Sequence, residues 1–396
     1  MMLKDKYDVV VVGAGPGGSA TAKRCAELGL SACLLEKRQE IGAPKRCGEG
    51  LSNHKMDVLH FGNIPDFCKM QAIRGAIVYA PDKKEVAVDF GGVAGWVMER
   101  KMFDKWLAME ASRAGAHVQA KTNVTGVLKE GSKIVGVRGE YEDEPFEIRS
   151  NVVVACDGIE SQVSRWAGLN TTNTLINVDS GYQFEMSNID LRDPGMLEMF
   201  VGNDIAPRGY VWIFPKGKDV ANVGIGVSMC DKPARYYLEK FVKSHPGLKN
   251  GSIIEVNSGG IPLGGFLDNM VLDGFAVVGD AAHQVNPIHG GGMKEATYAG
   301  RLLAEVIAEA AKKNDFSQKA LSPYNTRWWD ERGQHLRKVE KLRQVFEKMS
   351  DDDLNMLADA LKGQDLLDFA RGSNLGMLVK ILMKKPKLMM LARHLL

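Results

Sequence analysis

The stretch YDVVVVGAGPGG, residues 7–18, decides the fold. Its first half is a continuous apolar run, which predicts a strand buried on both faces of a parallel sheet. Its second half, Gly13-Ala14-Gly15-Pro16-Gly17-Gly18, contains the pattern G-x-G-x-x-G. A helical pattern follows over residues 19–29, and a second apolar strand ends at Glu36. The order strand, glycine turn, helix, strand and acid predicts a dinucleotide-binding unit.

Each part of this pattern has a physical role toward a dinucleotide. Gly13 permits the tight turn, and Gly15 lets the backbone approach the pyrophosphate. Gly17 belongs to the same turn, and Gly18 lets the helix and the strand pack closely. The start of the helix directs unpaired N–H groups at the phosphates. Glu36 is placed to accept hydrogen bonds from the adenosine ribose, but the pattern alone does not separate NAD from FAD.

The composition sets the class of protein. The chain has 396 residues, so we expect a core domain with a second region inserted or appended. Hydrophobic residues make up 45% and charged residues 25%, as in soluble globular proteins. The formal net charge of +2 is too small to indicate a nucleic-acid partner. No apolar run approaches the ~20 residues of a membrane span, and the N-terminus lacks the layout of a signal peptide, so we expect a cytoplasmic protein.

The cysteines do not indicate a metal site. The six of them are scattered along the chain, and none forms a C-x-x-C pair. Zinc and thioredoxin-like sites are therefore not expected, and we predict no metal. Cys25, Cys33 and Cys156 lie in apolar surroundings and are interpreted as small core residues.

Two later segments narrow the cofactor. Residues 152–168 read as a buried strand that runs into Asp157 and Gly158 and then a helix. Residues 274–296 read as a strand that ends at Gly279 and Asp280, then a loop rich in glycine, then a helix. A glycine turn, a DG segment and a GD segment in this order resemble the para-hydroxybenzoate-hydroxylase class of flavoproteins. The resemblance implies an α/β fold with an FAD-binding Rossmann-like domain.

The same resemblance implies individual cofactor contacts. Asp280 matches the aspartate that bonds the ribityl chain of FAD, and Gly292 and Met293 match the glycine and helix start that contact the flavin. Backbone donors at a helix N-terminus suit an electron-rich flavin edge. Arg100, at the start of a helical pattern, and Val124, in a short predicted strand, match two further cofactor contacts. Asp157 is also counted among the predicted cofactor contacts. Arg100 is equally well interpreted as a solvated residue at a helix start.

The loop KRCGEG, residues 45–50, follows the second predicted strand and can reach the flavin ring. Its glycines, Gly48 and Gly50, indicate backbone held close to a ligand. We therefore count Cys47, Gly48 and Gly50 among the cofactor-binding residues. Cys47 is interpreted first as a backbone contact, with a chemical role for its thiol as the alternative.

The second informative stretch is PRGYVWIFP, residues 207–215, with aromatic rings at alternate positions. In a strand, Tyr210, Trp212 and Phe214 would share one face. This motif, which begins at Pro207 and ends at Pro215, and the cysteine-glycine loop together resemble the geranylgeranyl reductase family. The resemblance covers about the first four-fifths of the chain. It is greatest with archaeal members, which saturate the isoprenoid chains of membrane lipids and use FAD.

The residues themselves agree with a lipid site. The segments 196–202, 209–217 and 219–227 read as successive strands of an antiparallel sheet in a second domain. If this sheet covers the flavin, its aromatic face lines an apolar cavity in which each buried methylene contributes ~0.8 kcal/mol. The five motif residues are therefore the predicted substrate contacts. The alternative is that the rings are sheet core packed on a helix.

These predictions define the domains. The FAD-binding domain is expected to be discontinuous and to comprise residues 1–75, 96–175 and 270–315. An inserted antiparallel-sheet domain for substrate is expected over 76–95 and 176–269, and a C-terminal helical region over 316–396. Asp351, Asp352 and Asp353 indicate a helix start.

The last stretch, residues 374–396, combines apolar residues with lysines. It is either an amphipathic segment that makes a peripheral membrane contact or a helix pair separated at Pro386.

The predicted activity is FAD-dependent reduction of isoprenoid C=C bonds. Cys47 and His289 are weak candidates for the proton source, because their loops are expected near the flavin. No second strand–glycine–helix unit appears, so the electron donor could be NAD(P)H or a ferredoxin. One alternative is a flavin monooxygenase or halogenase on the same scaffold. Another is a non-enzymatic prenyl carrier with no tightly held flavin.

Overall fold

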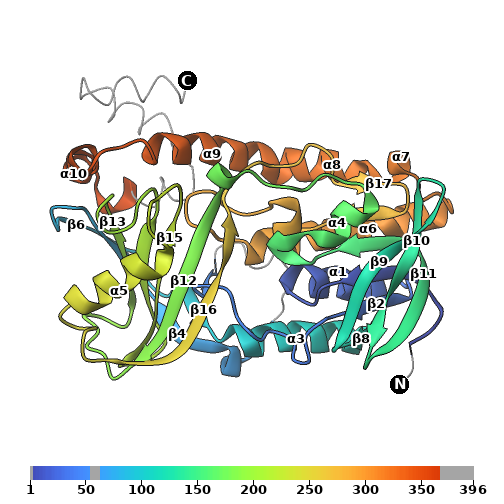
Figure 1. Ribbon diagram of the computed structural model, residues 1–396, viewed down its shortest axis with the longest axis horizontal. Coiled ribbons are helices and arrows are strands. Elements are labelled where there is room, and N and C mark those ends of the chain that lie inside the picture. Colours follow the sequence, from blue (N-terminus) through green and yellow to red (C-terminus); the bar gives the residue numbers. More distant parts are fainter. Residues whose placement is uncertain (1–2, 54–62, 366–396) are drawn as a thin grey trace.

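A computed structural model describes residues 3–53 and 63–365 of the chain. Within them the strands form sheets of eight, seven and three strands. The eight-stranded and seven-stranded sheets lie at opposite ends of the molecule, and a long C-terminal helix runs along one side of it (Figure 1). This arrangement leaves the functional site between the two large sheets.

The eight-stranded sheet contains the predicted parallel unit. Val9–Val12 of the first strand are buried and pair in parallel with both neighbouring strands. A buried apolar run is the expected sequence for such a central position. The sheet has the order β17-β18-β11-β1-β2-β8, with β10 and β9 added to β11. Its strands are β1 (Lys6–Val12), β2 (Ala32–Leu35), β8 (His117–Gln119), β9 (Thr122–Glu130), β10 (Lys133–Tyr141), β11 (Glu144–Ala155), β17 (Val271–Leu272) and β18 (Phe275–Val277).

Helices pack on this sheet, and the N-terminal ends of two of them form part of the site. The first, α1 (Pro16–Glu27), follows the glycine turn, and α6 (Met293–Lys312) packs directly against it. Gly300 permits this close approach, because a Cβ there would collide with Thr21 and with the backbone of Gly17. Two further helices near the sheet are α3 (Arg100–Arg113) and the short α4 (Gln162–Ala167). The predicted strand, turn, helix and strand are thus confirmed.

The seven-stranded sheet has the order β16-β12-β15-β14-β13-β5-β6. The predicted run of antiparallel strands is confirmed for β13, β14 and β15. The sheet is not wholly antiparallel, however, because β5 lies parallel to β13. Its strands are β5 (Gly75–Tyr79), β6 (Glu85–Asp89), β12 (Val178–Ser187), β13 (Met196–Val201), β14 (Tyr210–Pro215), β15 (Val220–Val227) and β16 (Ser252–Pro262).

One face of this sheet carries its own apolar core. Val211 and Ile213 of β14 are buried with residues of β15 and of helix α5 (Ala234–Ser244). Their neighbours Tyr210, Trp212 and Phe214 therefore point to the other face. The alternation decides which side of β14 is core and which side is available to a ligand.

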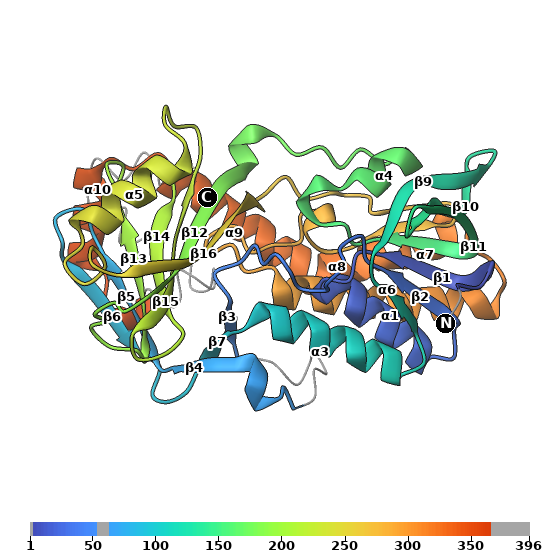
Figure 2. The same cartoon turned by 60° about the horizontal axis from the view of Figure 1, so that its bottom comes forward.

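A small sheet lies beside the two large ones. It has the order β3-β7-β4, with β3 (Gly50–Ser52), β4 (Lys69–Ile73) and β7 (Gly95–Met98). Figure 2 shows these strands between α3 and the seven-stranded sheet. Because β3 starts at the end of the KRCGEG loop, this sheet anchors the loop between the two halves of the molecule.

The C-terminal part is helical, as expected. Ser350 and Asp353 form a capping box at the start of α10, which confirms the predicted helix start. Apolar side chains of α9 and α10 pack together and contact Val201 and Ile288. The stretch 374–396, with Pro386, lies outside the described residues. The helices are α7 (Gln318–Leu321), α8 (Pro323–Trp328), α9 (Gln334–Phe346) and α10 (Asp351–Ala360).

Within the described residues, no helix has both the length and the apolar character needed to cross a membrane.

Candidate cofactor and substrate site

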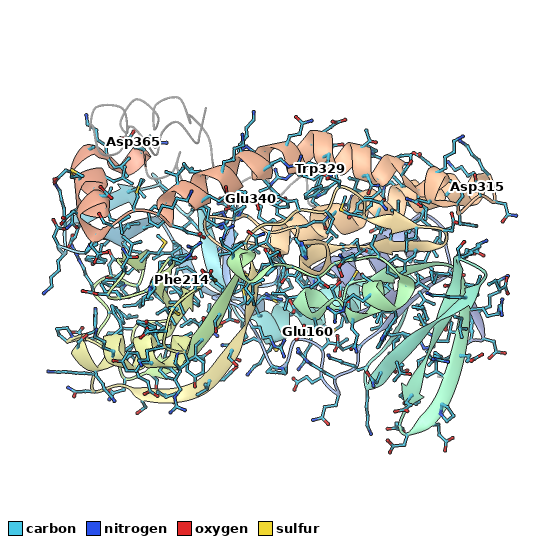
Figure 3. All side chains as sticks on the ribbon, turned by 45° about the horizontal axis from the view of Figure 1, so that its top comes forward. Glu160, Phe214, Asp315, Trp329, Glu340 and Asp365 are labelled. Carbon is cyan, nitrogen blue, oxygen red and sulfur yellow. The ribbon has the colours of Figure 1, made fainter. Side chains whose placement is uncertain are left out.

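One cavity of about 1210 Å³ joins the two halves of the molecule. At one end it is lined by the glycine turn and Glu36, and at the other by apolar residues of β5, β6 and α10. Figure 3 labels Phe214 on the seven-stranded sheet and Glu160 near α4, both of which line this cavity. A single space therefore reaches both the predicted nucleotide cradle and the aromatic strand.

The glycine turn is built for close packing on one side and for open space on the other. Gly13 has φ of +104°, and a Cβ on Gly18 would overlap the carbonyl oxygen of Gly13. Gly15, in contrast, stands at the N-cap of α1, and a Cβ on it would have nothing within 4 Å. Gly13, Gly15 and Gly17 line the cavity, whereas Gly18 lies behind them. The open side at Gly15 fits a phosphate group at a helix N-terminus.

Glu36 and Val124 lie at the same end of the cavity. One carboxylate oxygen of Glu36 accepts the backbone N–H of Ala14 at 3.0 Å, and the other accepts that of Arg38 at 3.0 Å. This fixes the carboxylate at the edge of the glycine turn, where it retains lone pairs for ribose hydroxyls. Val124 is 7% exposed on β9.

Two aspartates mark the middle of the cavity. Asp157 accepts the backbone N–H of Val163 at 2.9 Å through one oxygen, and its other oxygen is buried without a partner among the described residues. Burial raises the pKa of both Asp157 and Asp280. A Cβ on Gly292 would lie 3.0 Å from Asp280 Oδ1. The unpaired oxygen and the glycine contact fit a bound group that carries hydroxyl donors, such as the ribityl or ribose part of FAD.

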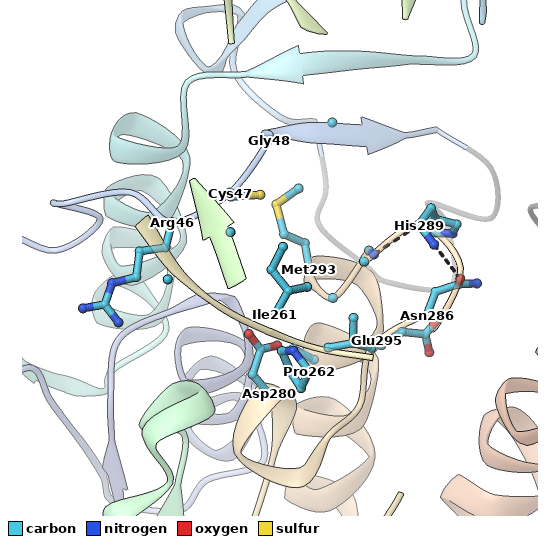
Figure 4. Close-up of a pocket in the computed structure, with 18 of the residues that line it drawn as sticks. Arg46, Cys47, Gly48, Ile261, Pro262, Asp280, Asn286, His289, Met293 and Glu295 are labelled. Carbon is cyan, nitrogen blue, oxygen red and sulfur yellow. Dashed lines mark hydrogen bonds between the residues drawn. The ribbon is translucent and has the colours of Figure 1, made fainter. Parts of the chain in front are cut away.

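Figure 4 shows Asp280, Met293, Cys47 and His289 around one opening. Gly292 is the N-cap of α6, and Met293 is its first residue. The helix start therefore presents unpaired backbone N–H groups to the cavity. These are the donors expected to face a flavin edge.

Arg100 is held by its own helix at the cavity wall. Its guanidinium bonds Asp104 through Nε at 2.9 Å and Nη2 at 2.8 Å. Burial acts to lower the pKa of Arg100, but Asp104 and Cys47 raise it above its ordinary value. The side chain is thus a partly buried, paired cation beside Cys47 rather than a solvated residue. Its predicted contact with FAD stays a prediction.

The cysteine-glycine loop packs on the aromatic strand. A Cβ on Gly48 would lie 3.1 Å from the Phe214 ring, and one on Gly50 would lie 3.3 Å from it. Gln183 links the two elements, because it donates to the backbone oxygen of Cys47 at 3.0 Å and accepts the Trp212 indole N–H at 2.8 Å. Burial raises the pKa of the Cys47 thiol, so the group stays protonated at neutral pH.

The three rings of β14 form a continuous aromatic wall. The centroids of Tyr210 and Trp212 are 5.8 Å apart, and those of Trp212 and Phe214 are 6.3 Å apart. All three side chains line the cavity, and the Tyr210 hydroxyl donates to the backbone oxygen of His289 at 3.0 Å. The alternative interpretation, that the rings pack against a helix in the sheet core, does not hold.

The two prolines of the aromatic motif lie at the ends of the aromatic strand. Pro207 and Pro215 are not among the residues that line the cavity. Pro215 is the last residue of β14 and pairs with Ala221, and Pro207 precedes the strand and accepts the backbone N–H of Ser228. They delimit the strand, as prolines do at strand ends, and their predicted contact with substrate stays a prediction.

The cavity face of the seven-stranded sheet changes from apolar to polar across the aromatic wall. On one side, toward β6, the register places only apolar side chains on this face. On the other side, toward β16, it places glycines and polar side chains, together with Ile261 opposite Asp179. The apolar group is Ala76, Val78, Val86, Val88, Leu197, Met199 and Val201, and the polar group is Asp179, Gln183 and Asn257.

Sequence reasoning missed the apolar half of this face and its cover by α10. Leu354, Leu357 and Ala358 of α10 line the same end of the cavity. The alternation in EVAVD, residues 85–89, was the available signal, since it indicates a strand with one apolar face. Nothing local indicates which element that face meets.

His289 lies on the loop before α6 and lines the cavity. Its Nδ1 accepts the backbone N–H of Gly291 at 3.1 Å, which places the ring proton on Nε2. Burial lowers the pKa of His289, so the ring is neutral near pH 7. The side chain is therefore a poor proton donor.

A buried ion cluster that the sequence did not reveal supports the cysteine-glycine loop. The Glu49 carboxylate is fully buried and contacts the ammonium groups of Lys45 at 3.1 Å and Lys216 at 2.9 Å. It also accepts the backbone N–H of Arg100 at 2.6 Å and the side-chain amide of Asn222 at 2.6 Å. Glu49 thereby ties the loop to α3 and to the seven-stranded sheet.

Replacing Glu49 with glutamine is expected to destabilise the protein by about 3 kcal/mol, because it leaves two buried ammonium groups with less compensation. Chemical denaturation would measure the loss. The matched control is Glu40→Gln, which breaks an exposed pair with Lys105 and should cause no measurable change. Equal stability of Glu49→Gln and wild type would show that the cluster does not hold the loop.

Comparisons with known proteins agree with this site. A family model described as the geranylgeranyl reductase catalytic domain matches residues 177–261, and one described as an FAD binding domain matches residues 6–218. The digeranylgeranylglycerophospholipid reductase of Methanocaldococcus jannaschii is 42% identical over 403 residues, which cover 100% of this chain and 99% of the relative. The reductase of the same name from Methanocella arvoryzae is 41% identical and covers 92% and 93%.

Solved structures show the same fold. A geranylgeranyl bacteriochlorophyll reductase-like protein from Thermoplasma acidophilum superposes with a TM-score of 0.90 at 34% identity, covering 99% of this chain and 100% of that one. The flavin-dependent brominase Bmp2 has a TM-score of 0.73 at 22% identity, covering 93% and 94%, which shows a shared fold only.

The glycine turn, the paired helix starts and the FAD-binding family model define the class as an FAD-dependent oxidoreductase. Since its curated relatives are about 40% identical over essentially their whole length, the chain belongs to the digeranylgeranylglycerophospholipid reductase family. The fold class, the cofactor FAD and the family predicted from the sequence are thereby confirmed.

Proposed function

We propose that the protein saturates the C=C bonds of geranylgeranyl chains in archaeal-type membrane-lipid precursors, converting digeranylgeranylglycerophospholipid to saturated archaeol lipid. The observation that supports this most strongly is the single cavity. It is lined both by the glycine turn and Asp280 and by the aromatic wall. Family membership supports the same substrate class.

The residues that would hold FAD follow from the cavity lining. The open backbone at Gly15 takes the pyrophosphate, and Glu36 takes the adenosine ribose. Asp280 and the start of α6 at Gly292 take the ribityl chain and the flavin edge. Bound there in its reduced form, FAD supplies a hydride to carbon.

The apolar half of the cavity binds the lipid chain. The aliphatic side chains of β5, β6 and β13 face those of α10 across this end. Burial of an isoprenoid chain against them contributes ~0.8 kcal/mol per methylene and excludes water from the double bond. Tyr210, Trp212 and Phe214 lie where this region meets the cofactor residues.

The aromatic wall has a further role in the reaction. An isolated trisubstituted alkene has no carbonyl to accept negative charge, so we expect protonation to accompany reduction and positive charge to develop on the substituted carbon. The faces of the three rings attract such a charge through their quadrupoles.

Anaerobic turnover tests the proposed function. Protein reconstituted with FAD and reduced with dithionite is mixed with digeranylgeranylglycerophospholipid, and the lipid is analysed by mass spectrometry. We expect the mass to rise by two hydrogen atoms for each double bond reduced. An oxygenated product formed with oxygen consumption would identify a monooxygenase instead. A protein that stays colourless after reconstitution would favour the prenyl carrier.

The same reconstituted protein can be used to test two further partners, the electron donor and the membrane. Bleaching of the flavin absorbance by NAD(P)H or by reduced ferredoxin would name the electron donor. Flotation with vesicles of anionic lipid would test a peripheral membrane contact, which we propose because the substrate is a membrane lipid.

Replacing Cys47 with alanine is expected to lower turnover by less than roughly tenfold, well below the 10²–10⁴-fold contribution of a general acid. The reason is that burial raises the pKa of the Cys47 thiol, which makes it a poor proton donor, while the backbone oxygen that accepts the Gln183 amide is kept in the variant. Steady-state lipid reduction measures the effect. A loss of 100-fold or more with normal FAD binding would instead make the thiol the proton donor.

A further inference from the structure

Asp179 is a buried acidic residue of β12 at the wall of the cavity. The residue is 4% exposed, and its side chain lines the cavity. Its Oδ1 atom is buried without a hydrogen-bond partner among the residues that the structure describes. Buried carboxyl oxygens are seldom left unpaired, and an unpaired one often marks a functional group.

The carboxyl group lies beside the aromatic wall. In the sheet register Gly226 stands opposite Tyr210, and Gly181 stands opposite Gly226 on the next strand. Asp179 is two residues before Gly181 and so shares this face. A Cβ on Gly226 would lie 3.1 Å from Asp179 Oδ2, and one on Gly209 would lie 3.3 Å from it. The glycines leave room for the acid next to Tyr210, where the polar and apolar halves of the face meet.

The surroundings raise the pKa of this acid toward neutral pH. Burial raises the pKa of Asp179 to about 6, and nearby Glu347 acts in the same direction. Ser228, Arg343 and Arg208 lower it. Arg343 and Glu347 face Asp179 from α9 and its C-terminal end, Ser228 follows β15, and Arg208 precedes β14. The phenol of Tyr210 and the thiol of Cys230 also interact with it. A carboxyl group with a pKa near the working pH is suited to general acid catalysis.

We propose that Asp179 is the general acid of the reduction, an assignment that rests on the proposed function. The O–H bond of its carboxyl breaks, and the proton forms a new C–H bond at one carbon of the double bond. The other carbon takes the hydride that reduced FAD supplies, so the π bond is replaced by two C–H bonds. Asp179 is left as a carboxylate and regains a proton from solvent.

The polar cluster behind Asp179 offers a path for that proton. Glu347 is paired with both Arg208 and Arg343, and burial raises the pKa of Glu347. Nε of each arginine is also buried without a partner among the described residues. Such a cluster suits ordered water, which carries protons readily between buried groups.

The other two candidates are weaker acids in this setting. The neutral His289 ring has only an Nε2–H to give, and Sγ of Cys47 accepts the backbone N–H of Glu49 at 3.1 Å. Burial raises the pKa of the thiol, which makes it a poorer acid than a carboxyl group that titrates near 6. Asp179 is therefore the side chain best matched to the task.

The test compares Asp179→Asn with Glu198→Gln. Glu198 is also a buried acid of this sheet with a pKa raised by burial, but it faces away from the cavity and accepts the Tyr79 hydroxyl at 2.8 Å. We expect Asp179→Asn to lose at least about 100-fold in turnover while the dissociation constants for FAD and lipid stay unchanged. Glu198→Gln should turn over within about twofold of wild type, since neither substrate nor cofactor touches it.

Two pH profiles supply readouts that a purely structural role would not give. The turnover of wild type should fall as the pH rises through about 6, because the acid form is the active one. The folded pKa of Asp179 lies above its ordinary value of 3.8, so its stabilising contribution is present below pH ~4 and is lost as the pH rises through about 6. Asp179→Asn lacks this loss, and its melting temperature should exceed that of wild type increasingly toward pH 7.5.

The outcomes separate the two proposals. Wild-type protein that leaves every lipid unreduced overturns the proposed function and the acid with it. Wild-type protein that reduces lipid, with Asp179→Asn equally active, overturns the role of Asp179 alone. Loss of activity in Asp179→Asn together with loss of FAD or lipid binding would likewise reject it and assign a structural role.

Discussion

Gly15→Ala is expected to weaken FAD binding by at least about two orders of magnitude and to leave the folded apoprotein as stable as wild type. Gly15 has extended backbone angles that alanine adopts freely, and a Cβ there meets nothing within 4 Å. The added methyl group would instead occupy the space of the pyrophosphate. Loss of two charge-assisted hydrogen bonds of about 1.5–3 kcal/mol each would weaken FAD binding by roughly 100-fold or more. Flavin fluorescence titration and thermal unfolding without FAD measure the two effects.

Gly18→Ala is the contrasting variant in the same turn. Its Cβ would overlap the carbonyl oxygen of Gly13, and neither backbone can move without separating α1 from β1. We expect this variant to unfold or to lose several kcal/mol of stability. If Gly15→Ala bound FAD as tightly as wild type, the pyrophosphate would lie elsewhere and the cradle would be wrongly assigned.

The second large effect is expected from Val78→Trp in the apolar half of the cavity. Val78 lines the cavity on β5, opposite Met199 and close to the aromatic wall in register. An indole there blocks the path of a long chain. If about four methylenes lose their burial, the loss is ~3 kcal/mol, or roughly 100-fold in turnover of digeranylgeranyl lipid. A short prenyl substrate should be affected much less, which steady-state kinetics with both substrates would show.

Ile253→Trp is the control for this substitution. Ile253 lies on the edge strand β16, is 49% exposed and does not line the cavity. The same bulky side chain there should leave both substrates unaffected. Equal losses for long and short substrates in Val78→Trp would indicate a general disturbance of the fold, and unchanged turnover of the long lipid would mean that its chain follows another path.

The parts of the site that could be predicted from the sequence are those that depend on short local patterns. The glycine turn, the GD segment before α6 and the alternating rings of β14 each lie within one short segment. Turn chemistry and strand alternation decide their structure without knowledge of distant residues. For this reason the strand, the helix start and the shared face of the rings could be predicted.

The parts that could not be predicted depend on register between distant strands. Glu49 meets Lys216 only because the cysteine-glycine loop docks at the end of β14. Asp179 shares a face with Tyr210 only through the pairing of β12 with β15 and of β15 with β14. A buried ion pair or a lone acid has no periodic signature in a sequence, since its meaning comes from its partners.

For the prolines of the aromatic motif, the sequence pattern suggested a role that the position in the strand does not require. Pro207 and Pro215 belong to the pattern by position, so the motif suggested a ligand contact for all five of its residues. Their actual place at the ends of the strand follows from the lack of a backbone N–H. A motif thus records residues that shape an element together with residues that touch a ligand.

A crystal structure of the protein with FAD and digeranylgeranylglycerophospholipid bound would test the shared cavity directly. We expect one geranylgeranyl chain in the cavity between β5, β13 and α10, with a double bond between the rings of Tyr210 and Trp212 and the flavin. A lipid chain bound outside this cavity, or a flavin separated from those rings by protein, would contradict this expectation.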